Sequence, residues 1–227
     1  LEKKCYAYDI QAACAGFIVA SFDANAYIKS GLYKKVIVVC AEKMSSMVNY
    51  EDRATCPLFG DGAAAVLMEP TEEPVGFVDG VFHVDGSGLE HLVYKAGGSA
   101  HPTTHETVDA KENCLYQEGR AVYKSAVMDM FNSSKEVMER NNLKIEDVKW
   151  FVPHQANLRI IEAVGSRLGL SEEQVLVNIQ KVGNTSAASI PICLDHNKGK
   201  LKKGDKIVLT AFGAGFTWGA SYLIWGM

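Results

Sequence analysis

Three short segments of the chain carry side chains that could do chemistry together. The first holds Cys14, in the run DIQAACAGF between a strand-like stretch and the apolar stretch from Phe17 to Ile28. A thiol on the first turn of a helix meets unpaired N–H groups and the positive end of the helix dipole, which favour the thiolate. Free cysteine is also among the most buried side chains. Cys14 is therefore predicted to be either a nucleophile or a small core residue.

The other two segments add a histidine and an asparagine. His154 follows Pro153 in the run VPHQANLRI, and Asn184 lies in the run GNTS. Alone, His154 would cap a helix or fill the core, and Asn184 would form an ordinary turn or cap. Functional sites of open α/β sheets lie at the carboxyl ends of strands, where we expect all three residues. Their combination favours a nucleophile with two polar partners.

Alternating apolar strands and helices must position these residues. Strands are expected at 5–10, 36–40, 63–68, 149–152, 206–210 and 219–225, and helices at 17–30, 123–141, 156–168 and 187–196. The strand at 36–40 is apolar throughout, which is typical of burial on both faces. Residues 70–118 are polar, with Gly and Pro, and are expected to form short strands and excursions. The pattern predicts an α/β fold with mixed sheets flanked by helices, and its two similar halves suggest a duplication.

Composition narrows the class of protein. The chain has 227 residues, 48% of them hydrophobic, and a net charge of −4, which suits one large domain or two small ones. It has no strongly basic excess and no apolar stretch of the ~20 residues that span a bilayer, and we expect no signal peptide. Six scattered cysteines without a CxxC pair favour reduced thiols. We expect a cytoplasmic protein with neither a nucleic-acid nor a membrane partner.

Four runs in order carry a family resemblance. DIQAACAGF, PHQANLRII, GNTSAASIP and AFGAGFTWG, between residues 9 and 219, resemble the motifs of β-ketoacyl-acyl-carrier-protein synthase III, a thiolase-fold condensing enzyme. The closing GFTWG favours this branch over chalcone-synthase-like enzymes. The resemblance implies a thiolase-like fold of duplicated mixed-sheet halves sandwiching buried helices, with the nucleophile in 1–118 and the histidine and asparagine in 119–227.

The family's opening βαβα portion has no counterpart, and the chain begins with Leu1 rather than Met. We therefore expect the first half to be incomplete. A sheet with an unpaired edge would result, so 1–227 alone is not expected to turn over.

The resemblance also implies a reaction. Cys14 would take the acyl group of an acyl-CoA as a thioester. His154 and Asn184 would donate hydrogen bonds to the malonyl-acyl-carrier-protein thioester as it loses carbon dioxide. The backbone N–H groups of Cys14 and Ala214 would form the oxyanion hole, with Ala214 where the family often has Gly. The product, 3-oxoacyl-acyl-carrier-protein, starts fatty-acid synthesis. No permanently bound cofactor is implied, acyl-CoA being a substrate, and the enzyme would be a homodimer.

Further positions match the family's binding residues. Those implied to contact acyl-CoA are Arg53, Gly119, Tyr123, Ala126, Asn157 and Phe212. A solvated surface arginine and plain core packing are the alternatives for Arg53 and Phe212. Those implied to dock the acidic carrier protein are Lys124, Arg159 and Arg167, with Ser166 replacing a common basic residue. The lysines at 198, 200, 202, 203 and 206 indicate a solvated loop that could assist docking.

Two other interpretations remain open, and a third, a metal site, is opposed by the residues. A polyketide- or quinolone-type condensing enzyme would use other acyl donors on the same triad. A non-catalytic partner would bind carrier protein or a catalytic subunit, although it would not need all three polar residues. His101 and His105 are spaced i,i+4, but Pro102 opposes the helix that would align them, so a surface loop and no metal site are expected.

Overall fold

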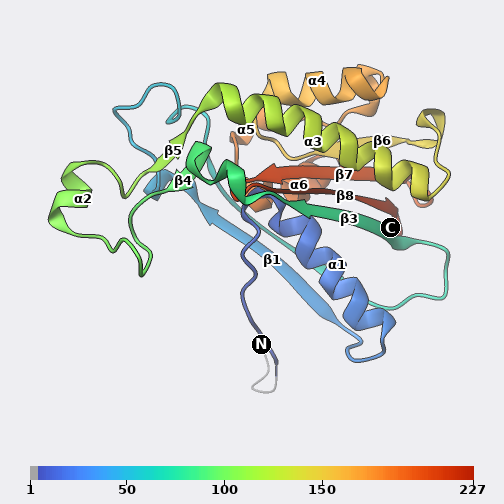
Figure 1. Ribbon diagram of the computed structural model, residues 1–227. Coiled ribbons are helices and arrows are strands. Elements are labelled where there is room, and N and C mark those ends of the chain that lie inside the picture. Colours follow the sequence, from blue (N-terminus) through green and yellow to red (C-terminus); the bar gives the residue numbers. More distant parts are fainter. Residues whose placement is uncertain (1–4) are drawn as a thin grey trace.

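The computed structural model describes residues 5–227 and is built around a four-stranded mixed sheet (Figure 1). Its strand order is β3 (Gly76–Val84), β8 (Thr217–Ile224), β7 (Lys206–Gly213) and β6 (Trp150–Pro153). The β6–β7 pair is parallel, with Pro153 opposite Thr210, and the other two pairs are antiparallel. The expected α/β fold with a mixed sheet is therefore confirmed.

Helices cover both faces of this sheet (Figure 1). On one face lie α3 (Gly119–Arg140) and α4 (Leu158–Leu168), and on the other lie α1 (Gly16–Lys29) and α6 (Ser189–His196). Asn157 caps α4 through its side-chain oxygen, and Gly169 ends that helix with a φ of +79°, which suits glycine.

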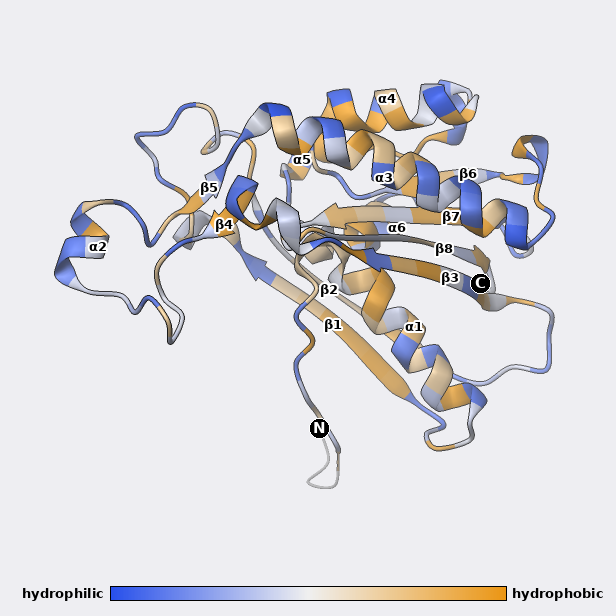
Figure 2. Cartoon of the chain, in the orientation of Figure 1, coloured by the Kyte–Doolittle hydropathy of each residue, from blue (hydrophilic) through white to orange (hydrophobic). Residues whose placement is uncertain are grey.

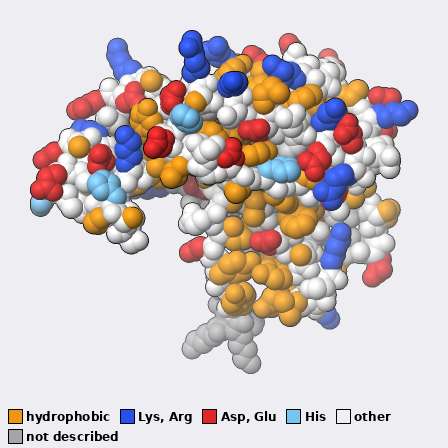
Figure 3. Space-filling model, in the orientation of Figure 1, with side chains coloured by type: hydrophobic (Ala, Val, Ile, Leu, Met, Phe, Trp, Pro, Cys, Tyr) orange, Lys and Arg blue, Asp and Glu red, His pale blue; other side chains and the backbone are white. Residues whose placement is uncertain are grey.

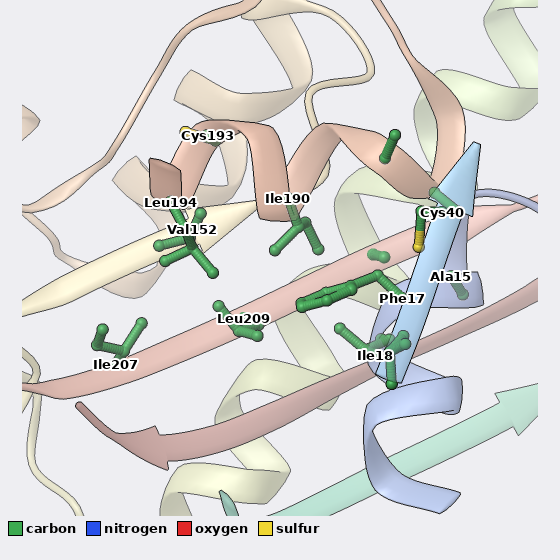
Figure 4. Close-up of a cluster of buried hydrophobic side chains, with 14 of the residues drawn as sticks. Ala15, Phe17, Ile18, Cys40, Val152, Ile190, Cys193, Leu194, Ile207 and Leu209 are labelled. Atoms are coloured by element: carbon green, nitrogen blue, oxygen red, sulfur yellow. The ribbon is translucent and has the colours of Figure 1, made fainter. Parts of the chain in front are cut away.

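A two-stranded antiparallel sheet forms the next layer beyond α1 and α6. It consists of β1 (Val36–Lys43) and β2 (Asp61–Met68). Between the two sheets, Ile18 of α1, Cys40 of β1, Ile190 of α6 and Leu209 of β7 point into one apolar core (Figure 4). The hydrophobic residues along β1 and α1 are visible in Figure 2. This core thus joins three layers, the four-stranded sheet, helices α1 and α6, and the β1–β2 sheet, whereas α3 and α4 pack on the other face of the main sheet through a second hydrophobic cluster.

The outer face of the β1–β2 sheet is apolar but lies in solvent. Ile37, Val39 and Leu67 are more than half exposed, while Val38 and Cys40 face inward. Figure 3 shows hydrophobic side chains gathered on the lower part of the molecule, over α1 and β1. The expected burial of 36–40 on both faces is wrong, because within residues 5–227 nothing packs against the second face.

Two further expectations need correction. Residues 5–10 form no strand and are largely exposed, since the described chain offers them no strand to pair with. Residues 70–118 do contain short pieces, namely β4 (Leu92–Tyr94), α2 (His105–Asp109) and β5 (Leu115–Gln117), but also the long strand β3. Gly76, Gly80 and a bulge between Phe77 and Asp79 interrupt the alternation of β3. Since β3 pairs with β8, the expected division at residue 118 cuts across the main sheet.

Gly60 shows how closely distant segments approach near the site. A Cβ on Gly60 would lie 2.0 Å from the carbonyl oxygen of Val182, and the Gly60 N–H donates to the Asn184 carbonyl at 2.9 Å. The backbones at residues 60 and 182–184 are therefore in direct contact.

In the part of the chain that the structure describes, every helix is too short or too polar to span a membrane.

Replacing Gly60 by Ala should therefore destabilise the fold. The added methyl forces the backbone at 182–184 to move, at a cost of about 1–3 kcal/mol. Urea unfolding of Gly60→Ala checks this. Gly199→Ala, where an added Cβ meets nothing within 4 Å, is the control. Equal unfolding midpoints for the two variants would contradict the predicted overlap.

Candidate functional site

Cys14 lies in a single 3-10 turn, Ala13–Ala15, directly before α1. Its side chain is half-buried. The end of β7 comes so close that a Cβ on Gly213 would lie 2.7 Å from the Cys14 backbone nitrogen. Ala13 has a φ of +44°, a left-handed conformation that costs a non-glycine residue energy. The glycine and the strained turn together fix the Cys14 backbone against the carboxyl end of a central strand.

The Cys14 thiol is held neutral by its surroundings. Its pKa is raised to about 11, chiefly by burial; the neighbouring Ser186 side chain lowers the pKa, and the negative charge of Glu42 raises it. Glu42 lies on the inward face of β1 with Val38 and Cys40; burial raises the pKa of its carboxyl group, while the Ala187 backbone and the Ser186 side chain lower it. The resting thiol is therefore neutral, in contrast to the expectation that the helix terminus favours the thiolate, and burial is the main cause.

His154 follows β6 and is fully buried. Its backbone N–H donates to the Thr210 carbonyl of β7 at 2.7 Å, which continues the parallel pairing. Its ring Nδ1 lies 2.7 Å from the Ser189 hydroxyl. Burial lowers the pKa of His154 to about 3, so the imidazole is neutral over the ordinary pH range.

Asn184 sits in a turn after α5 (Ile179–Val182). Its backbone N–H donates to the Leu58 carbonyl at 2.8 Å, and its side-chain oxygen accepts from the Ser186 N–H at 2.9 Å. The side-chain NH₂ group makes no hydrogen bond within the described part of the chain. With the oxygen occupied, Asn184 presents its amide as a donor.

The segment 184–189 brings the three predicted residues together. It carries Asn184, its Ser186 side chain lies beside Cys14 and lowers the pKa of the thiol, and its Ser189 hydroxyl lies 2.7 Å from the His154 ring. Ser186 has a φ of +50°, so this segment too is strained beside Cys14. The supporting residues Glu42, Ser186 and Ser189 were not predicted from the sequence. The sequence does indicate the orientation of Glu42: it lies two residues after Cys40 on an apolar strand, so both side chains point to the same face of that strand.

The residues implied to bind acyl-CoA and carrier protein lie in several parts of the fold. Tyr123 on α3 lies beside α4, because the Arg159 guanidinium is 5.6 Å from its ring centroid. Gly119 is exposed at the start of α3, Ala126 is buried in the same helix, and Asn157 caps the start of α4. These positions therefore lie on two neighbouring helices.

The other implied residues lie elsewhere. Phe212 is buried near the end of β7, with its ring centroid 4.7 Å from that of Phe216. Ala214 is half-buried in the β7–β8 turn, and Arg53, Lys124, Arg159, Ser166 and Arg167 are exposed.

The remaining charged candidates are mostly paired on the surface. His101 lies 2.7 Å from Glu112, and α2 begins only at His105, so the two histidines do not share a helix. Among residues 5–227, no three or more His, Cys, Asp or Glu side chains are grouped to hold a metal ion. In the lysine run, Lys198 pairs with Asp195 and Lys206 with Asp147.

Removing the charge of Glu42 should lower the pKa of Cys14. In Glu42→Gln the pH profile of Cys14 alkylation by iodoacetamide, followed by peptide mass spectrometry, should move to lower pH. Each unit of decrease raises the thiolate fraction about tenfold at a fixed pH below the pKa. Glu69→Gln, just beyond the opposite end of the β1–β2 sheet, should leave the profile in place. An unshifted profile in Glu42→Gln would show that this carboxylate does not act on the thiol.

His154 should make the fold less stable in acid. The unfolded ring titrates near pH 6.5, whereas the folded ring stays neutral to about pH 3. Between these values the unfolded state binds the extra proton, so stability falls as pH falls, by about 1.4 kcal/mol per pH unit for this one group. Urea unfolding at pH 7, 6 and 5 should give a shallower pH slope for His154→Gln than for the unaltered chain. Equal slopes would contradict the neutral buried ring.

Comparison with known proteins identifies the family of the chain. Family models described as "3-Oxoacyl-[acyl-carrier-protein (ACP)] synthase III" and as its C-terminal part match residues 8–86 and 138–225. The chain is 58% identical over 220 residues to the "Beta-ketoacyl-[acyl-carrier-protein] synthase III" of Porphyromonas gingivalis, covering 97% of this chain and 66% of that protein. It is 56% identical to a Bacteroides thetaiotaomicron relative of the same description, covering 99% and 67%.

Comparison with a solved structure establishes the fold. The crystal structure of 3-oxoacyl-[acyl-carrier-protein] synthase III from Aquifex aeolicus superimposes with a TM-score of 0.88 at 44% identity, covering 98% of this chain and 68% of that one. The thiolase-like fold is thereby confirmed. The chain spans about two thirds of the length of these relatives. It belongs to the β-ketoacyl-[acyl-carrier-protein] synthase III family.

Proposed function

We propose that this chain carries the reactive centre of an acyltransferase that condenses an acyl-CoA primer with malonyl-acyl-carrier-protein. The products would be 3-oxoacyl-acyl-carrier-protein, carbon dioxide and free CoA, which starts fatty-acid synthesis. The observation that carries the proposal is the convergence of Cys14, His154 and Asn184 on the segment 184–189. A nucleophile and two neutral hydrogen-bond donors in one buried place suit acyl transfer through a thioester.

In the first step the Cys14 sulfur attacks the thioester carbonyl of acyl-CoA. The new Cys14–acyl thioester forms as the bond to the CoA sulfur breaks, and the thiol proton leaves with CoA. Negative charge on the carbonyl oxygen needs donors, and the backbone N–H groups of Cys14 and Ala214 suit this role. The close approach at Gly213 supports it, because it holds the turn carrying Ala214 beside the Cys14 backbone.

In the second step the malonyl thioester loses carbon dioxide, and its carbonyl oxygen becomes an enolate oxygen. A neutral His154 and the unpaired amide of Asn184 can each donate a hydrogen bond to that oxygen. Each such donor typically contributes ~10²–10³ in rate. The carbanion attacks the acyl carbonyl on Cys14, and the released thiolate regains a proton. Burial favours these steps, because hydrogen bonds to developing charge are stronger away from water.

The substrates would approach between α3 and α4. Gly119, Tyr123, Ala126 and Asn157 would line the path of the pantetheine arm, and Phe212 would shield the thiol. Arg53 would contact the nucleotide end of CoA. Exposed Lys124, Arg159 and Arg167 would dock the acidic carrier protein, in keeping with the Lys and Arg side chains along the top of Figure 3. A cytoplasmic homodimer without a permanently bound cofactor completes the proposal.

Incubation with radiolabelled acetyl-CoA tests the first step alone, which is a single acyl transfer to Cys14 and does not require the chain to turn over. One acetyl group should appear per chain, on the peptide containing Cys14, and labelling should be lost in Cys14→Ala. Cys56→Ala is the matched control, since Cys56 is likewise a free, half-buried thiol. Absence of label from the unaltered chain, or label that persists in Cys14→Ala, would overturn the proposal.

A panel of acyl-CoA thioesters extends the same experiment to the choice of primer. Short straight or branched acyl groups are expected to label fastest, and a pocket distinguishes one methylene by only ~1–3 kcal/mol. Preferential labelling by long or aromatic acyl groups would instead favour a polyketide- or quinolone-type condensing enzyme.

A further inference from the structure

We propose that Ser189 is a positioning residue that fixes His154 in the tautomer protonated at Nε2. Its hydroxyl donates a hydrogen bond to Nδ1 of the ring, so the single N–H proton of the neutral histidine stays on the opposite nitrogen, Nε2. The consequence for catalysis rests on the proposed function, whereas the tautomer is a property of the folded chain. The distance from Ser189 Oγ to His154 Nδ1 is 2.7 Å.

The direction of this hydrogen bond follows from a third residue. The Gln155 backbone N–H donates to Ser189 Oγ at 3.3 Å, so the oxygen already accepts one hydrogen bond. A serine hydroxyl has one hydrogen to give, and the ring nitrogen is the only acceptor within reach of it in the described chain. Ser189 and His154 are 0% and 1% exposed, so bulk water cannot supply another partner. Nδ1 therefore accepts.

Gln155 is itself clamped, which keeps its N–H aimed at Ser189. Its side-chain nitrogen donates to the Pro153 and Leu176 carbonyls at 2.8 and 3.3 Å. Its side-chain oxygen accepts from the N–H groups of Asn178 and Ile179 at 2.9 and 3.2 Å. Four bonds on a fully buried amide hold the strand end at Pro153 and the start of α5 together. The orienting donor therefore cannot turn away without breaking this network.

The tautomer decides what the ring offers to a substrate. With Nδ1 accepting from Ser189, Nε2 carries an N–H that can donate to a developing enolate oxygen. The opposite tautomer would point a lone pair at that oxygen and repel it. Because the ring is neutral, it cannot have a proton on both nitrogens. A serine far along the chain from His154 thus determines whether the ring is a donor or an acceptor at the site.

Nitrogen NMR of the 227-residue chain labelled with ¹⁵N-histidine tests this directly. Coupling of the ring nitrogens to the ring C–H protons distinguishes the protonated from the unprotonated nitrogen, and loss of the signals in His154→Gln assigns them. We expect Nε2 to be protonated and Nδ1 unprotonated at pH 7. In Ser189→Ala, both tautomers should become populated, and Ser189→Thr, which keeps the hydroxyl, should restore the original pattern.

Ser133→Ala is the matched control, because Ser133 is equally buried but bonds the Asp129 carbonyl on α3. A proton on Nδ1 in the unaltered chain, or an unchanged tautomer in Ser189→Ala, would overturn the inference. If Ser189→Ala does not fold, the spectrum of the unaltered chain alone decides between the two tautomers. The expected spectra combined with unlabelled Cys14 would leave the tautomer assignment standing and refute only the proposed function.

Discussion

Buried polar side chains are concentrated in the segment 184–189, and most of them find partners there, although Thr185 Oγ1 has none in the described chain. A polar side chain removed from water without a partner costs several kcal/mol, and a low dielectric makes each satisfied hydrogen bond correspondingly stronger. Asn184, Ser186 and Ser189 are all buried here, and their partners come from three separate parts of the chain. Ser186 reaches the 3-10 turn before α1 and the inward carboxylate of β1, and Ser189 reaches the end of β6. The two layers of sheet are thereby tied together at the point where chemistry is proposed.

In the free protein the Cys14 and His154 side chains do not form a thiolate–imidazolium ion pair. Burial moves the pKa of Cys14 upward and that of His154 downward, so both groups are neutral near pH 7. A cysteine activated by a neighbouring imidazolium is poised to react with any electrophile. The neutral thiol is a much weaker nucleophile than the thiolate, so the Cys14 pKa of about 11 lowers its general thiol reactivity near pH 7.

Much of the site could be predicted because its main residues stand at the boundaries of apolar elements. In the sequence, Cys14 and His154 each stand at the boundary between an apolar run and a helix, and Asn184 stands in a turn that begins with glycine. Ser189 and Glu42 could not be found in this way, because their importance depends on which side chain the folded chain places opposite them. The long strand β3 was missed because a bulge and glycines hide its alternation. The strand expected at 5–10 depended on a neighbour that residues 5–227 do not provide.

The solvent-facing side of β1 has a consequence for local unfolding. A strand with water on one face and a single hydrogen-bonded neighbour opens at a lower free energy than a strand buried in the middle of a sheet. Glu42 is part of that strand, and its carboxylate is one of the charges that act on the Cys14 sulfur. Transient opening of β1 would carry this charge away from the thiol. Amide exchange along β1 and reactivity of the nucleophile are therefore expected to be coupled through a strand that itself contributes no reacting atom.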